Sequence, residues 1–234
     1  IKATIGTGLF VMSGLKYKEK EALPLSEGLL TTVYYQNDSD KQLHYAIEGS
    51  AYTAGSGIEW CIHQLGLADS AQDFDQHCQN LSSSEGVYFI PALTGLASPY
   101  WRDDIKGSFV GLTPSTQKEH LLRAVLESLA FQCQLILSHI PGKERFKTMI
   151  VDGGVSQSEL LCQLLADLTG LHIQRNDSHE GTALGVAILA AETDFGEIIP
   201  QKANAKAIPP SQKSTSVQKA YKEWLGYLEK QIKS

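Results

Sequence analysis

The sequence is poor in cysteine and has no arrangement of cysteines that would bind a metal. Its 234 residues include four cysteines, which form no Cys-x-x-Cys pair and all lie in apolar or helical stretches. The seven histidines also lack the spacing of metal ligands, so we propose no zinc site. Reduced core cysteines in a cytoplasmic protein are the favoured interpretation over a disulfide framework. The cysteines are Cys61, Cys78, Cys133 and Cys162.

Positive charge and long apolar runs are also scarce. Lys and Arg total 20 against 26 Asp and Glu, a net charge of −6, which argues against a nucleic-acid or anionic-membrane surface. A phosphate ligand stays open, because backbone amides bind phosphate without Lys or Arg. No apolar run approaches the roughly 18 residues of a membrane helix, and we find no signal peptide. The chain begins with Ile1 inside a predicted strand, which suggests a piece of a longer protein.

The order of elements indicates an α/β fold. Hydrophobic residues make up 42% of the chain, enough for a core. Strands dominate the first quarter and then alternate with helices, which is typical of a layered fold with a mixed sheet. Residues 37–40 are expected to form a polar hairpin loop and 199–210 a connector. The expected strands are 2–5, 9–12, 29–35, 43–47, 87–91, 148–151 and 172–174, and the expected helices are 51–67, 117–140, 157–168, 182–192 and 217–232.

The strongest chemical signal is the turn Asp152-Gly153-Gly154, between an apolar strand and a predicted helix. Two glycines let the backbone approach a ligand closely, and the helix start behind them offers N–H groups that suit phosphate. Ser156 and Glu159 have the spacing of a capping box at that start. The simpler interpretation is an ordinary strand–helix turn that uses glycine for its shape.

Two further glycine turns resemble the first. Gly6-Thr7-Gly8 lies between two predicted strands, and Gly55-Ser56-Gly57 lies near the start of a predicted helix. Taken singly, the first is more simply a hairpin turn and the second a site of tight helix packing. Together the three turns predict a nucleotide site assembled from distant segments. No Walker A, Gly-x-Gly-x-x-Gly or Gly-x-Ser-x-Gly motif is present, and we interpret Asp103 and Asp104 as solvated loop charges.

Several segments resemble one enzyme family. Gly107–Leu112, followed after seven residues by His120–Ser128, is similar to the second signature of the FGGY carbohydrate kinases. Other segments are similar to the glycerol kinases of that family, and the resemblance covers nearly the whole chain in order. These segments are Thr4–Phe10, Gly28–Thr32, Tyr45–Ser50, Gly86–Ala92, Thr94–Trp101, Val151–Gly154 and Glu180–Gly185.

The resemblance implies an actin-like, ribonuclease-H-like ATPase fold, with a mixed sheet flanked by helices. It implies that residues 1–234 are the C-terminal nucleotide-binding domain of a kinase that uses ATP and Mg²⁺. The N-terminal domain, with most polyol contacts and the catalytic Asp, is then absent from this chain, so no catalytic residue is assigned. The implied partners are a small polyol or sugar and the N-terminal domain, and self-association stays open.

The resemblance also assigns site residues one by one. Thr7 matches a Thr beside the nucleotide phosphates, and Gly55 and Gly154 match glycines that line the nucleotide. Phe10 matches an aromatic residue that packs on the carbon backbone of glycerol. Two positions depart from the family and put its usual nucleotide affinity or base preference in doubt, but not the fold. Glu59 replaces a Gln near the nucleotide, and Ser158 replaces an Asn near the adenine.

Four functions remain open. The leading one is the nucleotide-binding half of an ATP-dependent glycerol or polyol kinase, which transfers the γ-phosphoryl group to a primary hydroxyl. A kinase for another sugar, such as a pentulose or gluconate, is the second. A catalytically dead regulatory module, favoured only by Glu59 and Ser158, is the third, and a ligand-free structural domain is the fourth.

Overall fold

A mixed sheet forms the centre of the molecule. The structure is a computed structural model that describes residues 1–15, 25–36, 41–176, 181–195, 207–211 and 214–233. Across these residues, six strands pair in the order β3-β4-β2-β1-β7-β8. The expected loop at 37–40 and most of the expected connector lie outside the described residues. The strands are β1 (Lys2–Ile5), β2 (Leu9–Gly14), β3 (Leu30–Gln36), β4 (Leu43–Ala51), β7 (Thr148–Asp152) and β8 (His172–Arg175).

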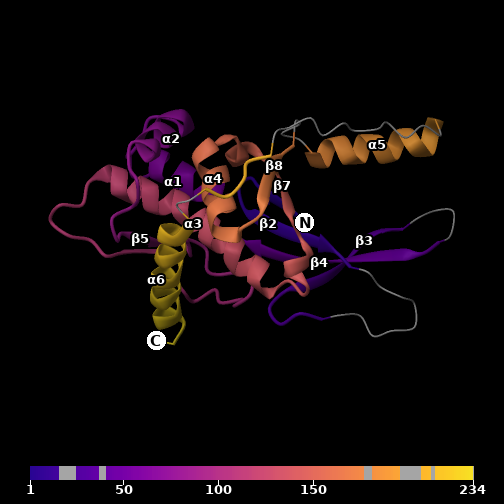
Figure 1. The fold of residues 1–234 in the computed structure, drawn as a ribbon, viewed down its shortest axis with the longest axis horizontal. Helices are drawn as coiled ribbons and strands as arrows, with labels where there is room; N and C mark the ends of the chain where they lie inside the picture. Colours follow the sequence, from indigo (N-terminus) through magenta and orange to yellow (C-terminus); the bar gives the residue numbers. More distant parts are fainter. Residues whose placement is uncertain (16–24, 37–40, 177–180, 196–206, 212–213, 234) are drawn as a thin grey trace.

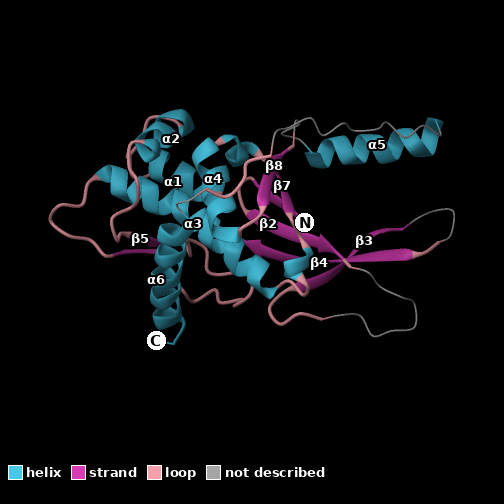
Figure 2. Ribbon diagram, viewed as in Figure 1, coloured by secondary structure: helices cyan, strands magenta, loops and turns pink. Residues whose placement is uncertain are grey.

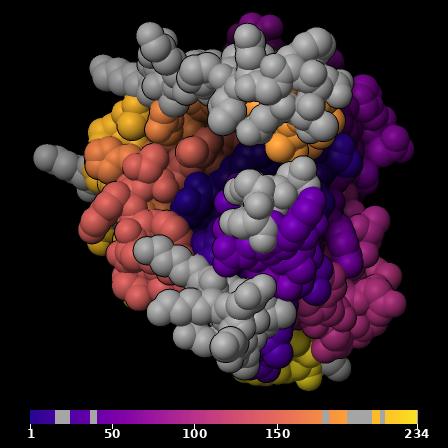
Figure 3. Space-filling view, turned by 90° about the vertical axis from the view of Figure 1, so that its right-hand side faces the viewer, coloured from indigo at the N-terminus to yellow at the C-terminus, as the bar shows by residue number. Residues whose placement is uncertain are grey.

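The sheet changes from antiparallel to parallel at β1. β1 pairs antiparallel with β2, which pairs antiparallel with β4, and β4 with β3. On its other edge β1 pairs parallel with β7, and β7 with β8. The β3–β4 hairpin extends beyond the body of the protein (Figure 1). Viewed from that end, the hairpin stands in front of the recessed first strands (Figure 3). A small second sheet pairs β5 (Tyr88–Ile90) with β6 (Ser108–Val110).

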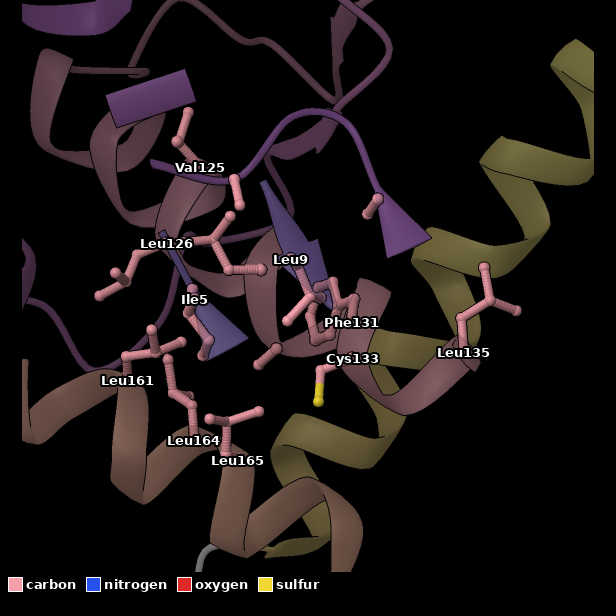
Figure 4. Close-up of a cluster of buried hydrophobic side chains, with 14 of the residues drawn as sticks. Ile5, Leu9, Val125, Leu126, Phe131, Cys133, Leu135, Leu161, Leu164 and Leu165 are labelled. Carbon is pink, nitrogen blue, oxygen red and sulfur yellow. The ribbon is translucent and has the colours of Figure 1, made fainter. Parts of the chain in front are cut away.

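Helices α3 (Lys118–His139) and α4 (Glu159–Thr169) pack on the buried face of the sheet. Apolar residues alternate along β1 and β2 with a period of two, so one face of each strand points to these helices. Figure 4 shows the resulting core, in which Ile5 and Leu9 meet side chains of α3 and α4. The other helices are α1 (Gly55–His63), α2 (Ala71–Gln79), α5 (Gly181–Phe195) and α6 (Ser214–Lys233).

The position of α6 is fixed by an aromatic anchor. Trp224 is 1% exposed, and its indole nitrogen Nε1 donates a hydrogen bond of 2.9 Å to the carbonyl oxygen of Phe89 in β5. Its ring also packs on Phe131 of α3, with 5.6 Å between ring centroids. Helix α5 lies apart from the other helices (Figure 2).

Among the described residues, one helix is long and apolar enough to cross a membrane. That helix is α3, and 83% of its most apolar window is buried inside the molecule. Its apolar surface is therefore accounted for by its place at the centre of the core. The four cysteines are free and buried, as the sequence predicts.

Two expectations about the elements are wrong in detail. The expected helix 51–67 is shorter, because Ala51 still pairs in β4 and the helix spans Gly55–His63. The capping box of Ser156 and Glu159 does not form. Instead, residues Gly154–Gln157 make a 3₁₀ turn, and Ser158 caps α4 by accepting a hydrogen bond from the Leu161 amide at 3.2 Å.

Helix α2 and strand β6 are not expected from the sequence. Only Phe74 and Cys78 of α2 are buried, so its apolar period is too sparse to identify a helix. The available signal is a cap: Ser70 accepts a hydrogen bond from the amide of Asp73 at 3.1 Å, in a Ser-x-x-Asp pattern. β6 has three residues, too few for a period to be recognised.

Candidate functional site

A cavity of about 830 Å³ opens where the three glycine turns meet. It is lined by the β1–β2 turn, the first turn of α1, one side of α2 and the segment between β7 and α4. Such a volume lies within the range of small-molecule sites. The lining residues are Gly6, Thr7, Gly55, Ser56, Ile58, Glu59, Ala71, Gln72, Phe74, Asp75, Leu126, Gly154, Val155, Gln157 and Ser158. The structure therefore brings together Thr7, Gly55, Glu59, Gly154 and Ser158, which the sequence places far apart.

The β1–β2 turn is fastened to the start of α1. The amides of Gly55 and Ser56 donate to the carbonyl oxygens of Gly6 and Thr7 at 2.9 and 3.0 Å. A Cβ at Gly55 would lie 2.5 Å from the Gly6 carbonyl oxygen, so this contact requires glycine. Tight packing is thus the reason for Gly55, and its amide is engaged by the turn. Gly55 still contributes to the cavity wall.

The turn after β7 contains two glycines with different surroundings. Gly153 has a φ of 91°, and a Cβ there would lie 2.4 Å from the carbonyl oxygen of Ile5. Gly154 has nothing within 4 Å of its would-be Cβ, and it lines the cavity. A 3₁₀ turn begins at Gly154, and the first amides of such a turn have no partner within the turn. This turn and Gly6-Thr7 therefore give one end of the cavity a backbone-lined polar wall.

The far end of the cavity is formed by α2 and the start of α4. Its polar side chains are Gln72 and Asp75 from α2 and Gln157 and Ser158 before α4. The Ser158 hydroxyl donates a hydrogen bond to Asp75 Oδ1, which joins the two elements. Glu59 lies on α1 with its side chain 60% exposed, and its Oε2 is 2.9 Å from His63 Nε2.

The rest of the wall is apolar. Ile58, Phe74, Leu126 and Val155 supply this part of the lining. A ligand that suits the whole cavity combines an anionic group, an apolar surface and hydrogen-bonding groups. A nucleotide has all three, in its phosphates, the face of its base and the edge of its base.

Phe10 is not brought to this cavity. It lies on β2 opposite Ser50 of β4, and it is 46% exposed on the face of the strand that points away from the core. The loop charges behave as the sequence indicates, because Asp103 and Asp104 are both exposed. Asp104 pairs with Arg102 at 2.6 Å, which lowers the pKa of its carboxyl group to about 2.

Three functional candidates are missed by the sequence reasoning. Gln72 and Asp75 are missed because their helix, α2, is not expected. The sequence indicates Asp152 only as part of a turn, yet its side chain is 1% exposed and its Oδ2 lies 2.8 Å from Lys2 Nζ on the neighbouring strand. A Cβ at Gly181, the first residue of α5, would lie 2.3 Å from Asp152 Oδ2. Asp152 therefore lies where β1, β7 and the start of α5 meet.

Comparisons with known proteins agree with this arrangement. The pattern of the FGGY family of carbohydrate kinases, C-terminal domain, matches residues 1–193. The glycerol kinase of Geobacillus sp. strain WCH70 is 35% identical over 230 residues, which are 95% of this chain and 45% of that protein. The probable glycerol kinase of Dictyostelium discoideum is 36% identical, over 99% of this chain and 43% of that protein. The chain thus spans less than half the length of these relatives.

Solved structures show the same fold. The glycerol kinase of Plasmodium falciparum, solved with ADP, matches with a TM-score of 0.81 and 30% identity, covering 98% of this chain and 46% of that one. The gluconate kinase of Lactobacillus acidophilus matches with a TM-score of 0.80 at 23% identity, and the match covers 100% of this chain and 47% of that one. The mixed sheet and its helices are therefore an actin-like ATPase domain. The chain belongs to the FGGY family of carbohydrate kinases and corresponds to its C-terminal domain.

Proposed function

We propose that this chain is the nucleotide-binding half of an ATP-dependent kinase that transfers the γ-phosphoryl group to a primary hydroxyl of glycerol or a related polyol. The observation that carries the proposal is the cavity, in which Gly6, Thr7 and Gly154 come together from separate segments. The similarity to glycerol kinases, at 35 and 36% identity, favours glycerol over a pentulose or gluconate as the substrate.

The residues present suit the binding of ATP. The Gly6 amide already donates to the Gly8 carbonyl oxygen at 3.0 Å. The backbone around Thr7 and Gly154 would hold the phosphates, since amides in turns bind anions without a positive side chain. The apolar part of the cavity, with Ile58 and Phe74, would cover the sugar and the face of the base. The base itself would lie between α2 and α4. A hydrolysable phosphate chain is thereby held in one orientation and partly shielded from water.

Mg²⁺ would be held mainly by the phosphates of ATP. In the part of the chain that the structure describes, no three His, Cys, Asp or Glu side chains gather as a metal site. This suits Mg²⁺, which is commonly bound through substrate phosphates, one or two carboxylates and water. When bound, the ion neutralises charge on the phosphates. The chain's own contribution is to bind and orient the nucleotide.

We also propose that the second half of the reaction site comes from an N-terminal kinase domain. The chain covers 43 to 46% of its glycerol kinase relatives, so those proteins contain a further segment of similar length. The base that accepts the proton of the substrate hydroxyl would belong to that domain. Phe10, exposed on β2, would contact the carbon backbone of the substrate. The buried, free cysteines support a reducing compartment, the cytoplasm.

Isothermal titration of the chain with ADP and ATP tests the proposal. Gly154→Ala is the informative variant, because its new methyl group projects into open space at the cavity and leaves the fold intact. We expect wild type to bind both nucleotides and Gly154→Ala to bind them about tenfold more weakly. Gly226→Ala, whose methyl group also meets open space but lies on α6, is the matched control and should bind as wild type does. Absence of nucleotide binding by wild type would overturn the proposal.

A further inference from the structure

The end of the cavity between α2 and α4 is organised around one side-chain pair. The Ser158 hydroxyl has a single hydrogen, and it is donated to Asp75 Oδ1. The Ser158 oxygen also accepts the Leu161 amide as the cap of α4. Ser158 therefore has no hydrogen left for a ligand, and the group it presents at this end is the carboxylate that it holds.

Asp75 is held in place from two sides. While Ser158 donates to Oδ1, the side-chain amide of Gln79 donates to Oδ2 at 2.5 Å. Each carboxylate oxygen can accept a second hydrogen bond, so the fixed side chain still has acceptor capacity. Asp75 is half-buried and lines the cavity. An ionised carboxylate accepts hydrogen bonds and donates none.

Such a group distinguishes the two purine bases. Guanine presents two neighbouring donors, its N1–H and its exocyclic N2–H₂, which match the two oxygens of a carboxylate. Adenine presents one donor, its N6–H₂, next to the N1 acceptor, and that acceptor would face an oxygen with no hydrogen to offer. Gln72 and Gln157 line the same end, but a carboxamide both donates and accepts, so it serves either base.

We infer that Asp75, fixed by Ser158 and Gln79, determines base preference in this cavity, so that guanine nucleotides bind at least as tightly as adenine nucleotides. The inference rests on the proposed function and specifies the ligand of the same site. It concerns the ratio of two affinities, whereas the proposed function concerns nucleotide binding itself.

The test is the dissociation constant of the chain for ADP and for GDP, measured by isothermal titration for wild type and Asp75→Asn. For wild type we expect the GDP constant to be no higher than the ADP constant. An asparagine offers one acceptor and one donor, the pattern that suits adenine. Asp75→Asn should therefore move the ratio of the two constants about tenfold toward ADP.

Two further variants complete the design. Asp73→Asn makes the same change of charge on the same helix. The Asp73 side chain accepts a hydrogen bond from the Asp69 amide at 2.9 Å and does not line the cavity, so the ratio for this variant should equal that of wild type. Asp75→Ala removes the acceptor altogether and should weaken GDP about tenfold while changing ADP by less than about threefold. It replaces the Asn variant if that protein does not fold.

The outcomes separate the two claims. Binding of ADP that is about tenfold tighter than that of GDP, with a ratio unchanged in both Asp75 variants, would overturn the role of Asp75 and leave the proposed function standing. Failure of wild type to bind either nucleotide would overturn both. A wild-type ratio at or below one that shifts in the Asp75 variants and not in Asp73→Asn would support the inference.

Discussion

At the scale of single residues, neighbouring glycines serve different purposes. Gly153 has a positive φ, and a Cβ at this position would collide with the backbone of Ile5, so the close approach of the β7 turn to β1 requires glycine. Gly154 has free space around it and borders the cavity. The fold requires glycine at position 153. At position 154, glycine leaves room for the proposed nucleotide to approach the backbone.

This difference predicts that substitution by alanine destabilises the protein strongly at Gly153 and little at Gly154. Gly153→Ala should lower the free energy of unfolding by about 3 kcal/mol, because the methyl group collides with the Ile5 carbonyl in a conformation that only glycine adopts easily. Gly154→Ala should change it by less than about 1 kcal/mol. Urea denaturation of the two variants measures both values. Equal losses would contradict the assigned roles.

The buried thiols predict a loss of stability in alkali. Burial raises the pKa of Cys61 and Cys133 to about 12 and that of Cys162 to about 11, from the ordinary value of 9.0. As the pH rises, the thiols of the unfolded chain lose their protons at a lower pH than those of the folded protein. The contribution of the protonated thiols to the free energy of unfolding is therefore complete below pH 9 and is lost as the pH rises toward 11 or 12. Denaturation at several pH values should show this fall, and Cys133→Ala should show a shallower one. An identical slope for Cys133→Ala would contradict the effect.

At the scale of elements, α2 is held by a buried ion pair of α3. Arg123 Nε and Glu127 Oε1 are 2.7 Å apart, and both side chains are about 5% exposed. Arg123 also donates to the carbonyl oxygens of Cys78 and Leu81, at the end of α2 and just after it, at 3.1 Å each. Glu127 accepts from Ser84 at 2.8 Å. This pair fixes the helix that carries Asp75.

Removal of the arginine should therefore loosen α2. We expect Arg123→Met to lower the free energy of unfolding by about 3–5 kcal/mol, because it leaves the charge of Glu127 buried without an opposite charge. The double variant Arg123→Met, Glu127→Leu should recover part of this loss, since no charge then remains buried. Urea denaturation of both proteins gives the comparison. A double variant less stable than the single one would argue against this explanation.

Much of this level of structure follows from the sequence. The period of apolar residues predicts α3 almost to its ends, because that helix is buried along its length. The glycine turns are predicted because paired glycines at the ends of predicted strands and helices allow tight turns and close backbone approach. The sequence predicts that the three turns meet at one site. It does not predict that the Gly55 amide donates a hydrogen bond to the Gly6 carbonyl oxygen, because that bond depends on tertiary contacts. Helix α2 has a mostly polar sequence, so it is not predicted. The contact between Asp75 of this helix and Ser158 therefore cannot be predicted from the sequence either.

At the scale of the whole molecule, the site is assembled by the order of strands. β1 is central, with β2 on one side and β7 on the other, so the turns that follow β1 and β7 end side by side. The helices α2 and α4 then close the cavity from the other end. The arrangement explains how a site without a compact sequence motif is formed from segments that span residues 6–158.

If the site is shared with a second domain, residues 1–234 alone should bind nucleotide without catalysing phosphoryl transfer. In the proposed function, the base and most substrate contacts would belong to a domain outside this chain, and positioning and proton transfer are each worth orders of magnitude in rate. The chain should therefore bind ATP but form glycerol phosphate at a rate near background in the presence of Mg²⁺ and glycerol. A coupled assay of ADP release measures this rate. Turnover typical of kinases, about 1 s⁻¹ or more, would show that the catalytic residues lie within residues 1–234.

The central claim is that three turns and two helices form one nucleotide site, and a crystal structure of the chain with ADP tests it most directly. We expect the phosphates to lie against the backbone of Gly6-Thr7 and Gly154, and the base to lie between Asp75 and the start of α4. We also expect the Gly55 amide to stay bonded to Gly6. ADP bound elsewhere on the molecule, or with its base at the glycine turns and its phosphates near Asp75, would contradict the account.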